Sequence, residues 1–193
     1  MLASRAGAIY LPAAPWVHGD VGFVGVTGWY DWTFLDEADE EPFSREVLEA
    51  GRLGSLQWMD GVCSYWTNRE GDAISPQKVA RAMAMNLDRN LQEVEAQVDK
   101  VVVVTHFLTH PGFFELKGEP RHDFVIAHAG SAELGKVIDA HPKVKRVISG
   151  HYHTPKQKEI EGVVLETSPL GYPRERSLPL FEHVQNRVVS VPV

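Results

Sequence analysis

Apolar residues form two short runs in the second half of the chain, and a histidine follows each run. Residues 101–105 are four valines and a threonine, followed by His106. Residues 144–149 hold three aliphatic side chains and lead through Gly150 to His151. Short apolar runs bounded by turn-forming residues indicate buried strands. We therefore predict two buried strands that present histidines at their carboxyl ends.

A helical repeat of apolar residues begins after Ser75 and Pro76. A serine followed by proline is typical of a helix N-terminus, where serine caps the helix and proline takes the first helical position. Apolar side chains then recur every three or four residues, at Val79, Met83, Leu87, Leu91, Val94 and Val98. This spacing predicts a long helix whose apolar stripe packs on a sheet.

A second helix is predicted between the two strands that end in histidine. Ser131 is suited to cap it, and apolar residues at helical spacing follow, at Leu134, Val137 and Ile138. A helical crossover between strands 101–105 and 144–149 predicts parallel pairing, which brings both carboxyl ends to one edge of the sheet. The sequence therefore predicts an α/β fold, with a sheet of mixed strands flanked by helices.

Shorter patterns predict further elements. Residues 21–27 alternate glycine with apolar side chains, which is typical of a strand that a neighbouring element approaches closely. The other expected elements are a short strand at 9–11, a short helix from Ser44 ended by Gly51 and Gly54, a helical turn at 56–59, a strand at 163–167, and a terminal hairpin built from 178–184 and 187–191.

Length and composition fit a single globular domain over residues 1–193. Hydrophobic residues make up 44% of the chain, which is enough for a sizeable core. The net charge is −7 and there is no Lys/Arg cluster, so we expect no stable binding to nucleic acid or to an anionic membrane.

Cysteine usage and hydropathy favour a cytoplasmic protein. Cys63 has no partner for an internal disulfide, and a small buried apolar role suits it better than a chemical one. No apolar stretch approaches the roughly 20 residues that span a bilayer. Pro12 and Pro15 interrupt the apolar residues near the start, which argues against a signal peptide.

The histidines at the strand ends point to metal binding. Neutral imidazole is the commonest protein ligand for transition metals, and ligands of open α/β sheets bind beyond the carboxyl ends of the strands. His151 and His153 are two residues apart, so in extended backbone they face opposite sides. This spacing favours two ions about 3.5–4 Å apart. A single zinc ion held by His106, His151 and His153 is the weaker alternative.

At these residues the chain resembles the calcineurin-like metallophosphoesterases. Gly150-His151-Tyr152-His153 is similar to the Gly-His-x-His motif of that family, and Thr105-His106 to the isolated histidine that precedes the motif. Residues 28–31, 129–131 and 170–173 also resemble segments of bacterial members.

The resemblance implies a four-layer αββα sandwich and a hydrolase that uses two divalent ions, Mn, Fe or Zn. His106 and His151 would hold one ion and His153 the other. A metal-bound hydroxide would then hydrolyse a phosphomonoester or phosphodiester, with a small molecule or a nucleotide as substrate. The resemblance assigns no catalytic residue of this chain beyond the metal ligands.

Three motifs of the resembled family are absent from this sequence: Asp-x-His, the Gly-Asp that bridges the metals, and Gly-Asn-His. Gly-Asp pairs occur at Asp20 and Asp72, but Gly-Asn-His follows neither. The sequence therefore predicts a domain that is incomplete at its amino terminus. Two interpretations stay open: a metallophosphoesterase without its amino-terminal half, or a catalytically inactive phosphoesterase-like domain that acts as a binding or scaffold module. An uncovered sheet edge would also favour homo-oligomers.

Other polar and aromatic residues are candidates for the substrate site. His128 and Tyr172 lie in or beside the resembling segments, and we expect them to contact substrate. His110 is either near the phosphate or, as we favour, a polar loop residue. The remaining histidines are expected at the surface: His18, His122, His141 and His183.

Ordinary structural roles suit several conspicuous side chains better than functional ones. Ser131 is better explained by helix capping than by nucleophilic attack. The aromatic turn at 28–32 favours packing over a place in the cleft, as do Trp58 and Trp66. The acidic segment 36–46 is a solvated loop rather than a cation site.

Overall fold

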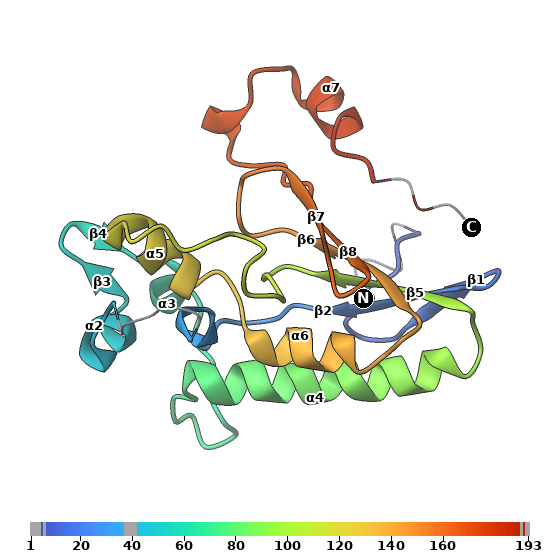
Figure 1. Ribbon diagram of the computed structural model, residues 1–193, viewed down its shortest axis with the longest axis horizontal. Coiled ribbons are helices and arrows are strands. Elements are labelled where there is room, and N and C mark those ends of the chain that lie inside the picture. Colours follow the sequence, from blue (N-terminus) through green and yellow to red (C-terminus); the bar gives the residue numbers. More distant parts are fainter. Residues whose placement is uncertain (1–4, 6, 37–41, 190, 192–193) are drawn as a thin grey trace.

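A six-stranded mixed sheet forms the centre of the protein (Figure 1). The computed structural model describes residues 5, 7–36, 42–189 and 191. The strand order is β1-β2-β5-β6-β8-β7, with the four central strands parallel and both edge strands antiparallel. The strands are β1 (Trp16–His18), β2 (Val21–Val26), β5 (Lys100–Thr105), β6 (Val144–Ser149), β7 (Lys156–Ile160) and β8 (Val163–Thr167). The predicted α/β class is confirmed.

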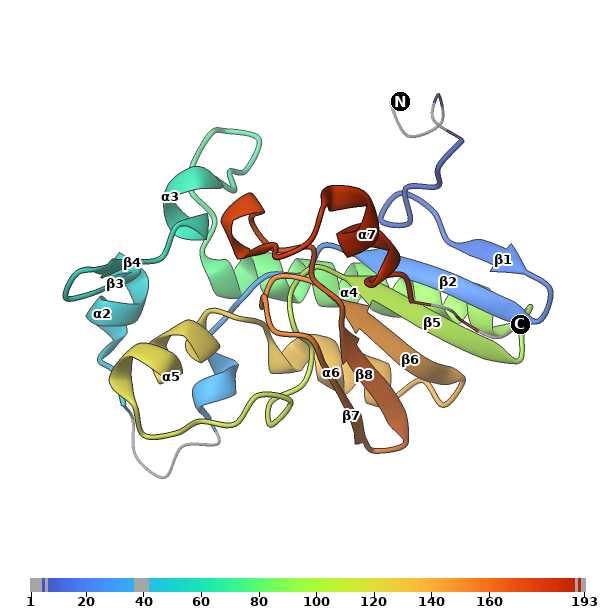
Figure 2. The same cartoon turned by 90° about the horizontal axis from the view of Figure 1, so that it is seen from above.

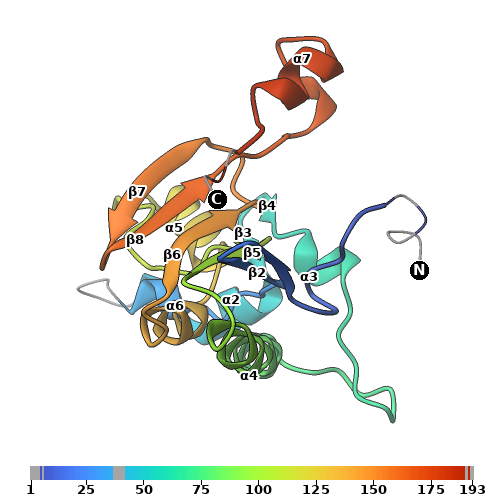
Figure 3. The same ribbon diagram turned by 90° about the vertical axis from the view of Figure 1, so that its right-hand side faces the viewer.

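Two helices cover one face of this sheet. In Figure 3, α4 (Pro76–Glu95) and α6 (Ala132–Asp139) lie side by side on that face, where they contact each other. The main core forms between these helices and the sheet, with Val24, Leu87, Leu91, Val101, Val103, Leu134, Ile138 and Val147 all buried. A Cβ atom on Gly22 would lie 2.2 Å from Val94 Cγ1. The absence of a side chain at Gly22 therefore lets α4 pack closely against β2, and the sequence predicted such a close neighbour.

Smaller elements gather beyond the carboxyl ends of the parallel strands (Figure 2). They are α2 (Arg45–Ala50), the hairpin of β3 (Arg52–Leu53) and β4 (Leu56–Gln57), α3 (Asp60–Cys63) and α5 (Pro120–Ala127). The helix from Ser44 and its end at Gly51, which has a φ of 58°, are confirmed. On the opposite side of the sheet from α4 lies α7 (Leu180–Gln185), as Figure 3 shows.

The pairing of β5 with β6 contains one irregularity that sets the register of their ends. Val101 lies opposite Val144, but Val102 lies opposite Arg146, so β6 carries an extra residue, Lys145. An unpaired residue of this kind is a β-bulge, which shifts every following side chain by one position. Thr105 is therefore opposite Ser149, and the two histidine-bearing loops leave the sheet together.

Three predicted elements are wrong. Residues 9–11 form no strand and lead into a turn, and 56–59 contain β4 instead of a helix. The first predicted strand of the terminal hairpin is replaced by α7, and residue 190 of the second lies outside the described residues. Leu180 and Val184 have helical spacing, and Pro179 suits a helix start. The sequence analysis also missed α5 and the polar edge strand β7, which offers no apolar run to detect.

The aromatic turn at 28–32 belongs to the core. Trp29, Tyr30 and Trp32 are each 5% exposed and pack in a second cluster with Phe107 and other buried side chains. The turn is joined to α6 by Ser131, whose hydroxyl donates to Asp31 Oδ2 at 2.5 Å and accepts from the Glu133 amide at 3.1 Å. Both structural interpretations, aromatic packing and serine capping, are confirmed.

No helix among residues 5, 7–36, 42–189 and 191 combines the length and the apolar character needed to cross a membrane.

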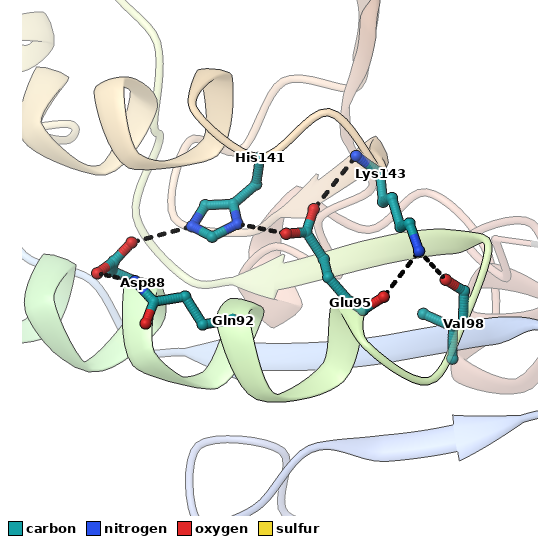
Figure 4. A network of polar contacts seen from close by, with 6 residues as sticks. All are labelled: Asp88, Gln92, Glu95, Val98, His141 and Lys143. Atoms are coloured by element: carbon teal, nitrogen blue, oxygen red, sulfur yellow. Dashed lines mark hydrogen bonds and ion pairs between the residues drawn. The ribbon is translucent and has the colours of Figure 1, made fainter.

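A buried histidine joins α4 to the loop between α6 and β6 (Figure 4). His141 Nδ1 lies 2.7 Å from Glu95 Oε2, and its Nε2 lies 2.9 Å from Asp88 Oδ1. The Lys143 side chain binds the carbonyls of Glu95 and Val98 at 2.8 Å each. His141 was expected at the surface, and this expectation is wrong because two carboxylates of α4 satisfy both ring nitrogens in a buried position.

The contacts of His141 with Glu95 and Asp88 predict that part of the free energy of unfolding depends on pH. Burial alone would lower the pKa of His141, but its hydrogen bonds to Glu95 and Asp88 outweigh burial and raise it. A histidine with a raised folded pKa stabilises the fold fully below its unfolded pKa, and the contribution is lost as pH rises through the folded pKa. We expect His141→Asn to lower the free energy of unfolding more near pH 6 than near pH 9. Urea unfolding at both pH values tests this, and an equal loss at both would contradict it.

Candidate active site

The two histidine-bearing loops are tied to each other by backbone hydrogen bonds. The His106 amide donates to the carbonyl of Thr27 at 3.0 Å, which fixes the first loop against the end of β2. The Gly150 amide donates to the His106 carbonyl at 3.1 Å, which fixes the second loop against the first. The parallel strands thus bring His106 and His151 to the same edge of the sheet, as the sequence predicted.

Gly150 allows a close approach between the two loops, and His151 makes the turn. The sequence suggested a tight turn or a close approach at Gly150, and the structure shows the close approach. A Cβ atom on Gly150 would lie 3.0 Å from His106 Nδ1. The turn is made by His151 itself, with a φ of 55°. A non-glycine residue rarely adopts this left-handed conformation, and such strain is concentrated at functional sites.

The imidazole rings of His106 and His151 meet edge to edge. His106 Nε2 lies 3.1 Å from His151 Nδ1. The ring of His151 stacks on Phe107, with centroids 4.1 Å apart, and meets the edge of Trp58 at 5.5 Å. Only 11% of its side chain is exposed, whereas His106 is exposed. Aromatic contacts therefore hold the His151 ring in one orientation beside the more accessible His106.

Both rings are kept unprotonated by their surroundings. Burial lowers the pKa of His151 to about 3, and the neighbouring His106 and His153 act in the same direction. Loss of solvent also lowers the pKa of His106, although Asp60 opposes it. Neutral imidazole is the form that binds metals, so both side chains are suited to coordination at physiological pH.

Asp60 is the carboxylate beside this pair. It begins α3, and its Oδ2 lies 3.6 Å from His151 Nε2. Burial raises the pKa of Asp60, and His106 opposes that shift. Sequence reasoning missed this residue because α3 is a single turn in a region without apolar periodicity, and the sequence carries no signal for its place.

His153 lies on another wall of the cleft and is paired with a carboxylate of its own. Its Nδ1 is 2.8 Å from Glu175 Oε2, which also accepts the Tyr172 amide at 2.8 Å. The ring of Tyr172 meets His153 edge to face at 4.7 Å. Glu175 was not singled out from the sequence, since it follows the resembling segment by two residues.

A cleft of about 620 Å³ joins these walls. It is lined by Leu56, Gln57, Trp58, Met59, Asp60, His106, Val125, His151, Tyr152, His153, Thr154 and Tyr172. Tyr172 lines the cleft and is 54% exposed, and its contact with a substrate stays a prediction. Among the described residues that line the cleft, none is a lysine or arginine, and most of the wall is apolar or aromatic.

The ring nitrogens of His106 and His151 have the spacing of two neighbouring ligands in a metal site. Ligand atoms that neighbour each other around one zinc ion, each about 2.0–2.1 Å from it, lie about 3–3.4 Å apart. The 3.1 Å between His106 Nε2 and His151 Nδ1 matches this spacing. Within the described part of the chain, however, no three potential ligands converge. The described residues thus place two potential donor atoms side by side at this edge of the sheet.

The predicted substrate contact of His128 is wrong because its side chain is buried. His128 has no exposed surface, and its Nδ1 donates to the Phe124 carbonyl at 2.8 Å, so it cannot touch a substrate in the cleft. His110 is a polar loop residue, as favoured from the sequence, and it is buried between Thr109 Oγ1 at 2.7 Å and Asp139 Oδ1 at 3.0 Å. His183 is also buried, with its Nε2 against the Leu170 carbonyl.

Comparison with known proteins yields one relevant fold. No family model matches the chain, and no curated protein matches it. Among solved structures, phosphopantetheinyl hydrolase from Mycobacterium tuberculosis matches with a TM-score of 0.62 and 20% sequence identity. The match covers 90% of this chain and 59% of that one, so the chain spans less than two thirds of the protein it resembles. The two proteins share a fold, and the neighbour is a hydrolase.

The expected membership in the calcineurin-like metallophosphoesterases is overturned by these comparisons. No model of that or any family matches, and the protein that shares the fold is described as a phosphopantetheinyl hydrolase. The resemblance depended on a few short segments around the strand ends. Histidines and glycines at such edges reflect where ligands bind in α/β sheets generally, so they did not define a family.

The low pKa of His151 predicts a loss of stability in acid. Between its ordinary pKa of 6.5 and about 3, the unfolded chain binds a proton at this residue and the folded protein does not. The free energy of unfolding therefore falls as pH decreases through this window, by at most about 1.4 kcal/mol per pH unit. We expect His151→Gln to remove this contribution, so unfolding curves of the metal-free proteins should converge in acid. Parallel pH profiles for both proteins would contradict the prediction.

Proposed function

We propose that the cleft hydrolyses a phosphate ester with the aid of a divalent metal ion held by His106 and His151. The observation that carries this proposal is the 3.1 Å separation between ring nitrogens of two neutral imidazoles that line a large cleft. The shared fold with a phosphopantetheinyl hydrolase supports phosphate-ester hydrolysis as the reaction class. The proposed metal dependence rests on the donor geometry and not on a family assignment.

The chemistry of such an ion suits this reaction. A divalent ion polarises a phosphoryl oxygen and lowers the pKa of a bound water. The protein's own contribution is to hold the two imidazoles in place: Phe107 supports the ring of His151, and the Gly150 amide ties the loops together. The remaining coordination positions would be free for water and substrate, as in catalytic sites generally.

The proposal includes one metal ion, where the sequence predicted two. His153 was expected to hold it, and in the structure its Nδ1 faces Glu175. Hard ions such as Mn²⁺ favour carboxylates, and the described residues bring Asp60 alone, as a carboxylate, to the lining of the cleft. We therefore propose one ion at His106 and His151, with His153 and Tyr172 placed to contact the substrate.

The walls of the cleft favour a substrate with an apolar or extended organic group. A volume of about 620 Å³ far exceeds a phosphate, and Leu56, Trp58, Met59 and Tyr172 offer apolar surface. Because no basic side chain is among the described lining residues, a highly charged polyphosphate is a poorer fit. A phosphodiester that carries a long, weakly charged arm matches this surface. The protein that shares the fold is described as a phosphopantetheinyl hydrolase, which supports this choice.

The incomplete set of metal ligands is also consistent with a second function, which is binding without hydrolysis. A domain that binds a phosphate ester without hydrolysing it would need the cleft but not a complete metal centre. Activity measurements separate the two functions, because a binding domain would bind substrate at the cleft without turnover.

Replacing either histidine should abolish turnover. We expect the full chain, loaded with Mn²⁺, to hydrolyse bis(p-nitrophenyl) phosphate, and His106→Ala or His151→Ala to reduce the rate to background, because each removes one of two metal donors. A chelator should have the same effect. His18→Ala is the matched control, since His18 is exposed in β1 and stacks on Trp16 outside the cleft. Full activity in either cleft variant would contradict the proposal, and an inactive wild type that still binds the ester would favour the binding domain.

A further inference from the structure

The Nε2 atom of His151 is buried and has no hydrogen-bond partner among the described residues. A buried polar atom that loses water without gaining a partner is destabilising, so each such atom needs a physical reason. Asp60 Oδ2 lies 3.6 Å away, and the backbone carbonyl of His128 also acts on the ring of His151. The surroundings of His151 therefore contain two groups that accept hydrogen bonds.

The orientation of the His151 ring is fixed by its other contacts. Its face stacks on Phe107 at 4.1 Å and its Nδ1 meets His106 Nε2 at 3.1 Å. Turning the ring over would place Cδ2 opposite His106 and abolish that contact. The Nε2 atom therefore faces Asp60 in the orientation that satisfies the ring.

A neutral imidazole carries its proton on one nitrogen only. A proton on Nδ1 would leave the Nε2 lone pair facing the carboxylate of Asp60, and the two would repel each other. A proton on Nε2 points at an acceptor and leaves the Nδ1 lone pair toward His106. We propose that Asp60 is a positioning residue that holds His151 in the Nε2–H tautomer and so directs the Nδ1 lone pair at His106.

The 3.6 Å separation is longer than a hydrogen bond, and the contact in this conformation is electrostatic. The Asp60 side chain is 33% exposed and begins a single helical turn. The inferred tautomer does not depend on the proposed function, whereas the inferred effect of Asp60 on metal binding rests on it. Histidines that bind metals commonly donate their other ring proton to a carboxylate, which fixes the tautomer and strengthens binding.

The tautomer is tested first, on the metal-free full chain near pH 7.5, by ¹⁵N NMR of the imidazole rings. The signal of His151 is assigned by its absence in His151→Gln. We expect the proton on Nε2 in the wild type and in Asp60→Asn, whose amide oxygen still accepts it. In Asp60→Ala the His128 carbonyl remains as an acceptor, and we expect part of the population to shift to the Nδ1–H tautomer. Asp99→Asn, an exposed residue before β5, is the matched control. A proton on Nδ1 in the wild type, or an unchanged tautomer in Asp60→Ala, would overturn the inference.

Zinc titration of the same proteins tests the consequence. We expect Asp60→Ala to weaken Zn²⁺ binding by about 10–100-fold, Asp60→Asn less, and Asp99→Asn not at all. Circular dichroism verifies that the variants are folded. Tight zinc binding that is identical in wild type and Asp60→Ala would overturn the role of Asp60 and leave the metal site standing. No zinc binding by a wild type with the expected tautomer would overturn the metal site and support Asp60 as the positioning residue.

Discussion

The site depends on the register between two parallel strands. One extra residue in β6, Lys145, places Thr105 opposite Ser149, and the histidine loops leave the sheet from these two residues. Because side chains alternate along a strand, a register different by one residue would send each following β6 side chain to the other face of the sheet. The 3.1 Å between His106 and His151 is therefore a consequence of backbone pairing that begins at the far end of the strands.

A second constraint acts through burial. Phe107 follows His106 in the chain and supports the ring of His151, so one short loop supplies both a donor and the surface on which the other donor stacks. The same burial removes water from His151 and keeps it unprotonated. The left-handed backbone at His151 adds strain that the surrounding loop contacts must offset. Packing, protonation and geometry are thus linked at a single residue.

The sequence allowed the framework to be predicted better than the cleft. Four consecutive valines and the apolar spacing after Ser131 are clear periodic signals, and they correctly predicted the parallel pairing that brings His106 to His151. Asp60 could not be found, because its place depends on how an irregular segment folds over the sheet edge. His128 was misjudged for a related reason: its neighbours in sequence suggested a cleft, but the aromatic cluster of Tyr30, Trp58 and Phe124 encloses it. Short motif fragments singled out two histidines that lie together in the structure, but they did not identify the family.

The central claim is that His106 Nε2 and His151 Nδ1 bind one metal ion together. Anomalous diffraction from crystals soaked in Zn²⁺ tests it most directly, because the scattering locates the ion independently of activity. We expect a peak within about 2.0–2.1 Å of both nitrogens. A peak bound through His151 Nε2, a peak elsewhere in the cleft, or no peak at these histidines would contradict it.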